Sequence, residues 1–204
     1  MGKTQEERSE TTRSTLVQIG RELFGNQGFT NTSIDQIVRK AKVNKGALYH
    51  HFAGKKELFS AVTEEVEGEV IQNAFAAINP DDSTWEKIEA GVLHFLGECV
   101  DPEIQQILLH DGPVVLGWER WHYSDRRTAT DTIYDYLNTI EGLETLNRAT
   151  LGVLTNMLSG MLMEAAKTIA YSDDSIKARE TASILIKNFI KSIRQSAVEL
   201  AEIQ

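Results

Sequence analysis

The stretch GFTNTSIDQIVRKAKVNKGALYHHFAGKKELF, residues 28–59, decides the fold. Thr32 and Ser33 can cap a short helix whose apolar residues recur with helical spacing. Residues 42–44 form a tight turn, and a second short helix follows over about residues 45–52. A capped short helix, a tight turn, a second short helix and a lysine-rich exit are together typical of a helix-turn-helix that lies on DNA.

The rest of the chain predicts an all-α fold. Its 204 residues contain three prolines and few β-branched runs, and long stretches repeat with helical periodicity. We expect about nine helices, with residues 1–10 frayed and an irregular segment at residues 102–117. The longer predicted helices span about residues 10–26, 55–78, 83–100, 124–140, 146–171 and 174–204.

Two domains are predicted. The clearest break in the sequence is the polar stretch at residues 79–83, and Gly28 gives a helix-ending signal earlier in the chain. We expect an N-terminal three-helix DNA-binding domain over residues 1–60. A larger helical domain over residues 61–204 would then bind a ligand and form a dimer.

Charge is divided unevenly along the chain. The formal net charge is −9, but residues 1–60 hold ten Lys/Arg against six Asp/Glu, a net of +4. Residues 61–204 hold eleven against twenty-four, a net of −13. A basic head on an acidic body favours one orientation against phosphate, although charge alone fits a solvated surface equally well.

The second short helix has residues that suit a DNA major groove. Gly46 and Ala47 are small, so the backbone can approach base edges closely. Leu48 and Phe52 lie four residues apart and should both face the core, which fixes the helix on its scaffold. The side chains then left to meet a base edge or a phosphate are those of Lys45, Tyr49 and His50.

Composition excludes several classes of protein. Cys99 is the single cysteine, which rules out a disulfide framework and a multi-cysteine zinc site. No apolar run approaches the roughly 18 residues of a membrane span, and the polar N-terminus lacks a signal core. We therefore expect a cytoplasmic protein with no membrane partner, no metal and no cofactor.

The segment LFGNQGFTNTSIDQIVRKAKVNKGALYHHFAGKKELF, residues 23–59, resembles the tetracycline-repressor (TetR) family of bacterial transcription regulators. The resemblance covers roughly residues 10–60 and follows the family pattern almost position by position. Two departures are Val38, where an alanine is common, and Lys42, where the turn usually has a glycine. Neither change removes a DNA contact, and Lys42 adds a basic side chain.

The resemblance implies a homodimer that binds a palindromic double-stranded DNA operator through two heads about 34 Å apart. It also implies which residues make the contacts. Contacts to bases would come from Lys45, Gly46 and Ala47, and contacts to phosphates from Thr32, Ser33, Tyr49, His50 and Lys55.

The last two predicted helices carry apolar residues on more than one side, which predicts burial on more than one side. A two-fold four-helix bundle, with two helices from each protomer, explains this pattern, and a monomeric core is the alternative. The residues predicted at the dimer interface are Leu154, Leu158, Met161, Leu185, Phe189 and Ile193.

An aromatic-rich irregular segment in the acidic body suggests a site for a flat or apolar small-molecule effector. Plain core packing is the alternative interpretation of each of its residues. The residues predicted to line the pocket are His94, Phe95, Cys99, Trp118, Trp121, Met157 and Met161.

These features predict a repressor that a small-molecule effector releases from its operator. A ligand-independent architectural or cell-cycle DNA-binding protein is the alternative function. We expect no enzyme, because the sequence has no phosphate loop, no zinc-protease helix and no nucleophile elbow. Cys99 with His94 and His110 could be drawn as a nucleophile and base, but a buried thiol in an amphipathic helix explains Cys99 better.

Overall fold

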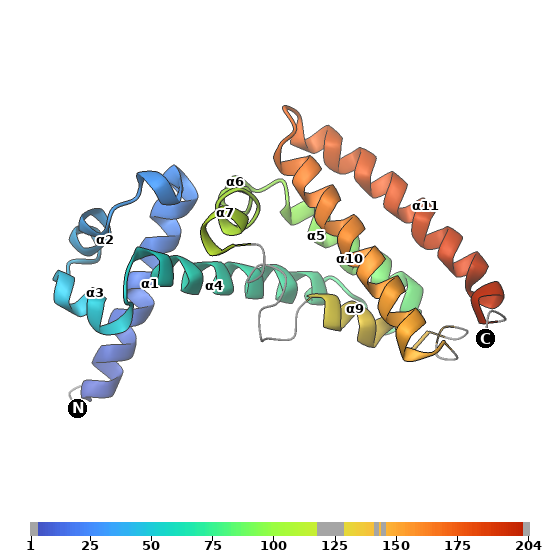
Figure 1. The fold of residues 1–204 in the computed structure, drawn as a ribbon, viewed down its shortest axis with the longest axis horizontal. Helices are drawn as coiled ribbons and strands as arrows, with labels where there is room; N and C mark the ends of the chain where they lie inside the picture. The colour runs from blue at the N-terminus through green and yellow to red at the C-terminus, as the bar shows by residue number, and fades with distance from the viewer. Residues whose placement is uncertain (1–3, 118–128, 141–142, 144–145, 202–204) are drawn as a thin grey trace. The chain divides into compact units, whose positions relative to one another are not determined.

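The computed structural model describes residues 4–117, 129–140, 143 and 146–201, and all the regular structure of these residues is helical (Figure 1). The segments α6, η1 and α7 follow one another without a break. Counted as one, they give nine helices among the described residues, which confirms the predicted all-α fold. In chain order the helices are α1 (Gln5–Asn31), α2 (Ile34–Ala41), α3 (Lys45–His51), α4 (Lys55–Ala76), α5 (Thr84–Glu98), α6 (Pro102–Ile104), the π-helix η1 (Gln105–Asp111), α7 (Gly112–Leu116), α9 (Ala129–Leu137), α10 (Arg148–Ala170) and α11 (Ser175–Ala201).

Helix α1 begins earlier than the sequence predicted. Thr4 caps it in a reciprocal capping box with Glu7, so the expectation that residues 1–10 are frayed is wrong for residues 5–10. At its other end, Gly28 has φ 77° and interrupts the helical backbone. The predicted stop at Gly28 is therefore confirmed, because this left-handed conformation favours glycine.

Caps define the two short helices. Ser33 is the N-cap of α2 and forms a capping box with Gln36. Asn44 is the N-cap of α3, and its side chain accepts a hydrogen bond from the Ala47 amide at 2.8 Å. Between them, Lys42 ends α2 in the left-handed region, with φ 55°.

The chain forms two compact units. The first comprises residues 1–69 together with residues 102–122, and the second comprises Val70–Asp101 and Tyr123–Gln204. In the first unit, α2 and α3 pack against α1, and η1 packs against α1 as well (Figure 1). Its core includes Leu16, Phe24, Ile37, Leu48 and Phe59, each fully buried.

The second unit is a helical bundle. Helices α10 and α11 run antiparallel and pack on α5, while α9 packs on α10 (Figure 1). The buried residues of its core cluster are Leu137, Ile140, Leu143, Leu146, Leu151 and Leu158. Among the described residues, no helix combines the length and apolarity that crossing a bilayer requires.

Lys42 provides a test of the turn. A left-handed conformation costs an L-residue about 1–2 kcal/mol, and glycine avoids most of this. We predict that Lys42→Gly raises the free energy of unfolding in urea by about 1 kcal/mol. Lys42→Ala is the matched control, because it loses the same charge but keeps a Cβ and should give no gain. A gain shared equally by both variants, or a loss in Lys42→Gly, would contradict this explanation.

Candidate DNA-binding surface

One face of α3 anchors it and the other is presented to solvent. Leu48 is fully buried and Phe52, just after the helix, is 3 % exposed, as predicted for core-facing residues. Tyr49 is 53 % exposed, and His50 is also exposed. The side chain of Lys45 at the first position of the helix is 57 % exposed. The first turn and one outer face of α3 are therefore accessible to a ligand as large as DNA.

Lys45 forms an exposed ion pair with a carboxylate of the neighbouring helix α2. Its Nζ lies 2.8 Å from Asp35 Oδ1 of α2, and both side chains are mostly exposed. The hydrogen bond and the charge of Asp35 raise the pKa of Lys45, so the ammonium stays charged at neutral pH. An exposed pair of this kind contributes little to stability, so a phosphate or guanine edge can replace Asp35.

Gly46 leaves the first turn of α3 without a side chain. A Cβ at this position would lie 3.1 Å from Asn44 Oδ1, the atom that caps the helix. Larger residues would crowd the cap, whereas glycine leaves the backbone of the first turn open. Ala47, the next residue, is half-buried. Small residues at both positions allow close approach to a groove floor.

Of the two predicted capping residues, only Ser33 caps α2. Its hydroxyl accepts from the Gln36 amide at 3.2 Å, and the residue is exposed. Thr32 is 1 % exposed and its hydroxyl donates to the Gly28 carbonyl at 2.8 Å. The Thr32 side chain thus closes the end of α1, and a phosphate contact would have to replace that bond.

Lys55 is also occupied within the head. Its Nζ donates to the Phe29 carbonyl at 2.7 Å and to the Thr32 carbonyl at 2.8 Å, and lies 4.1 Å from the centre of the Phe29 ring. Burial lowers the pKa of Lys55, and the charge of Asp111 acts in the opposite direction. The lysine therefore joins the first residue of α4 to the connection between α1 and α2. Spacing along the sequence gave no signal of this role.

Two of the residues predicted to line an effector pocket, His94 and Phe95, lie on α5, and a third, Cys99, is the C-cap of that helix. Cys99 is 1 % exposed, and burial, reinforced by Glu98, raises the pKa of its thiol to about 12. The thiol is thus protonated at neutral pH, which argues against a nucleophile. His94 Nε2 lies 3.3 Å from Glu98 Oε1, an ion-pair distance without hydrogen-bond geometry. Phe95 is half-buried.

The two methionines predicted to line the pocket differ in how far they are buried. Met161 packs against the core cluster of the second unit, whereas Met157 is 59 % exposed. Trp118 and Trp121 lie outside the described residues. No group of three or more His, Cys, Asp or Glu side chains among the described residues could hold a metal ion.

The predicted dimer residues divide into two groups. Leu158 belongs to the core cluster of the second unit, and Leu154, Met161 and Ile193 pack against it. These four side chains therefore stabilise the protomer itself. Leu185 is 63 % exposed and Phe189 is 39 % exposed, so only this pair faces outward. On α10 the exposed apolar side chains are Val153 and Met157, a pair four residues apart.

Family comparisons agree with this geometry. Residues 16–62 match the family model described as bacterial regulatory proteins, tetR family. Residues 85–193, more than half of the chain, match the tetracyclin repressor-like C-terminal domain. The Transposon Tn10 TetC protein of Escherichia coli is 29 % identical over 79 % of this chain and 82 % of its own length.

Solved structures have the same fold. A TetR-family transcriptional regulator from Pectobacterium atrosepticum superposes with a TM-score of 0.77 at 28 % identity, covering 92 % of this chain and 95 % of its own. RolR in complex with resorcinol gives a TM-score of 0.66 at 20 % identity, covering 97 % and 96 %. Because family models match both the helix-turn-helix region, residues 16–62, and most of the C-terminal region, residues 85–193, the chain belongs to the TetR family of helix-turn-helix transcriptional regulators.

Proposed function

We propose that this regulator is a repressor that binds a palindromic operator as a homodimer and leaves it when a small-molecule effector binds the body. The observation that carries the proposal is the arrangement of α3. Its Leu48 is buried while Lys45 and Tyr49 are exposed on the same short helix. A helix held by one face and presenting basic and phenolic groups on the other suits a major groove.

The contacts to DNA come from the exposed groups of α2 and α3. Lys45, Gly46 and Ala47 approach base edges from the first turn of α3. Tyr49, His50 and Ser33 donate to phosphates on either side of the groove. Thr32 and Lys55, which have partners inside the head, act by holding α2 in place.

The dimer forms through the outer faces of α10 and α11. Val153 and Met157 on α10 and Leu185 and Phe189 on α11 are exposed apolar side chains. In two antiparallel helices joined by a short turn, Met157 and Phe189 stand at about the same level, because they are similarly distant from the turn. Contiguous exposed apolar surface commonly marks an interface, and a second copy of the pair would complete a four-helix bundle.

The effector is a small molecule held by the body. RolR, a structural relative, is described in complex with resorcinol, a small aromatic ligand. In this chain Phe95 and His94 on α5 offer a ring and an imidazole of the kind that such a ligand contacts. A coupling free energy of about 1–3 kcal/mol between effector and operator reduces operator affinity about 5–150-fold. A tilt of α4, which changes the distance between the two heads, carries the coupling.

Two other functions fit less well. Enzyme catalysis through Cys99 is disfavoured because the pKa of its thiol is raised to about 12. An architectural DNA-binding role would use the same head and needs no effector. Genome-wide occupancy separates it from local repression, because an architectural protein occupies many sites and a repressor only a few.

The reading residues can be tested on a duplex that the native protein enriches from a random library. Lys45→Ala should reduce the preference for this duplex over unrelated DNA by about 1–3 kcal/mol per half-site, because a base contact is lost. Tyr49→Phe should weaken both complexes alike, by about 0.5–1.5 kcal/mol per lost hydrogen bond.

The logarithm of native affinity should fall with log salt at a slope near −7 if the dimer neutralises about eight phosphates.

Lys177→Ala is the control for this experiment, because Lys177 is an exposed lysine on α11 and its loss changes the net charge equally. Its affinity for both duplexes should match that of the native protein. Enrichment of no duplex, or unchanged binding by both Lys45→Ala and Tyr49→Phe, would refute the proposed function.

The role of Lys55 inside the head predicts an effect on stability. Lys55→Met keeps the apolar stem but leaves the carbonyls of Phe29 and Thr32 without their donor. We expect the free energy of unfolding to fall by about 1–2 kcal/mol. Lys56→Met, at the exposed neighbouring position, should change it by less than about 0.5 kcal/mol. Equal stability of the two variants would show that Lys55 does not hold the connection.

The dimer surface predicts a change of mass in solution. Met157→Glu with Phe189→Glu places two carboxylates per protomer on the outer faces of α10 and α11. Sedimentation should show a dimer for the native protein and a monomer for the double variant, since unpaired charges are costly to bury. Val114→Glu, at a residue 83 % exposed on α7, is the control and should remain a dimer. A native monomer, or a double variant that still dimerises, would contradict the assignment.

A further inference from the structure

The connection to α2, which begins with the last turn of α1 after the kink at Gly28, is held by a residue far along the chain. The Phe29 amide donates to Asp111 Oδ2 at 2.7 Å, across a separation of 82 residues in sequence. The same carboxylate oxygen accepts from Gln106 Nε2 at 2.9 Å. Asp111 is the last residue of η1, so a segment outside the helix-turn-helix contacts it directly.

The same peptide is held from the opposite side. While the Phe29 amide donates to Asp111, the Phe29 carbonyl accepts from Lys55 Nζ at 2.7 Å. The Phe29 ring lies 5.1 Å from the Phe59 ring in the core of the head. Both backbone bonds involve a charged group, and such hydrogen bonds are stronger than neutral ones. The chain immediately before the Ser33 cap of α2 is therefore fixed by η1 and α4 together.

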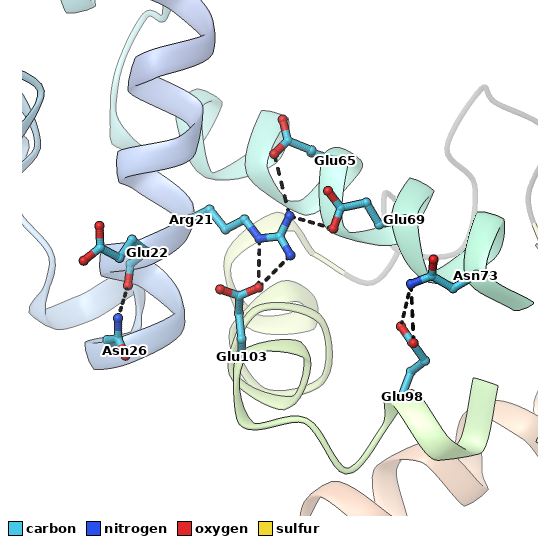
Figure 2. Close-up of polar contacts among 8 residues, drawn as sticks. All are labelled: Arg21, Glu22, Asn26, Glu65, Glu69, Asn73, Glu98 and Glu103. Carbon is cyan, nitrogen blue, oxygen red and sulfur yellow. Dashed lines mark hydrogen bonds and ion pairs between the residues drawn. The ribbon is translucent and has the colours of Figure 1, made fainter. Parts of the chain in front are cut away.

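A second set of contacts brings the same segment onto α1. Figure 2 shows Arg21 between Glu103 of α6 on one side and Glu65 and Glu69 of α4 on the other. Arg21 Nε lies 2.8 Å from Glu103 Oε1, and Arg21 Nη1 lies 2.7 Å from Glu69 Oε2. These ion pairs are partly exposed, so they fix geometry more than they stabilise.

Glycines on α1 allow this close approach. A Cβ at Gly25 would lie 2.8 Å from Glu103 Cγ, closer than packed atoms can be. A Cβ at Gly28 would lie 3.1 Å from Gln106 Nε2 and 3.4 Å from Asp111 Oδ2. One face of α1 is thus shaped to receive α6 and η1.

We propose that Asp111 is a positioning residue for operator binding: its carboxylate holds the Phe29 amide and so fixes how α2 and α3 are presented to DNA. The inference rests on the proposed function, since it assumes that α3 reads an operator. The reading unit then extends beyond the helix-turn-helix to include residues 102–111, and Asp111 acts through the protein without touching DNA.

The physical reason lies in the short reach of the specific contacts. Base readout needs side chains placed within hydrogen-bond distance of particular base edges, whereas non-specific binding depends on charge near phosphates. If the connection before α2 loosens, α2 and the α3 packed on it occupy a wider range of positions. Specific affinity then falls, and affinity for unrelated DNA stays the same.

The test uses full-length protein and the duplex that the native protein enriches. Asp111→Ala should bind this duplex about tenfold more weakly, while unrelated DNA binds equally well. Asp111→Asn keeps one acceptor oxygen without the charge and should lose about threefold. Asp173→Ala, which removes an exposed carboxylate between α10 and α11, is the matched control and should bind like the native protein.

Hydrogen exchange separates positioning from a general loss of structure. In Asp111→Ala, the amides of residues 29–41 should exchange faster, and those of α10 and α11 should keep their native rates. Faster exchange throughout the chain, or an equal loss of specific and non-specific affinity, would overturn the positioning role.

The remaining outcomes are also decisive. A folded Asp111→Ala that binds the operator as tightly as Asp173→Ala overturns the inference. If Asp111→Ala fails to fold, Asp111→Asn decides, because native affinity in that variant also overturns it. If the native protein enriches no duplex, the proposed function is wrong, and the inference is wrong with it. If the native protein binds its duplex and Asp111→Ala binds it equally well, only the inference is wrong.

Discussion

The exposed face of α3 depends on the packing of Leu48, which is fully buried in the core of the first unit. Helix α3 has seven residues, and isolated helices shorter than about 12–15 residues are marginal in water. Its existence and its orientation therefore come from packing and from the Asn44 cap. Because Leu48 and Phe52 take up the inner face, Tyr49 and Lys45 are left outside.

The same requirement for outside support applies to the connection before α2. Residues 28–33 comprise the last turn of α1, after the kink at Gly28, and the link to α2. They are held by the Thr32 hydroxyl, by Lys55 at the start of α4 and by Asp111 at the end of η1. The start of α2 is therefore positioned by side chains from two other helical segments, α4 and η1.

Local patterns in the sequence predicted the features that depend on neighbouring residues. The stop at Gly28, the inward face of α3 and the all-α fold follow from backbone conformation and helical periodicity. Long-range contacts could not be predicted in this way. Nothing near Asp111 indicates that it bonds to Phe29, and nothing near Lys55 indicates that its ammonium points inward.

In the second unit, too, the sequence could not predict which contacts form over long distances in the chain. Apolar residues on two sides of α10 predicted burial on both sides, but periodicity does not say which side meets the protomer's own core. The structure assigns Leu154 and Leu158 to that core and leaves Val153 and Met157 exposed. The choice depends on how α5, α9 and α11 pack around α10, which is a property of the whole unit.

In the proposed dimer, the two DNA-binding domains fit successive major grooves on the same side of the duplex. The most direct measurement compares the affinity of the native protein for its enriched duplex with that for the same duplex lengthened by about five base pairs between the half-sites, half a helical turn. We predict that the insertion reduces affinity to the level of unrelated DNA, because the second half-site then faces the opposite side of the duplex. Equal affinity for the two duplexes would contradict it.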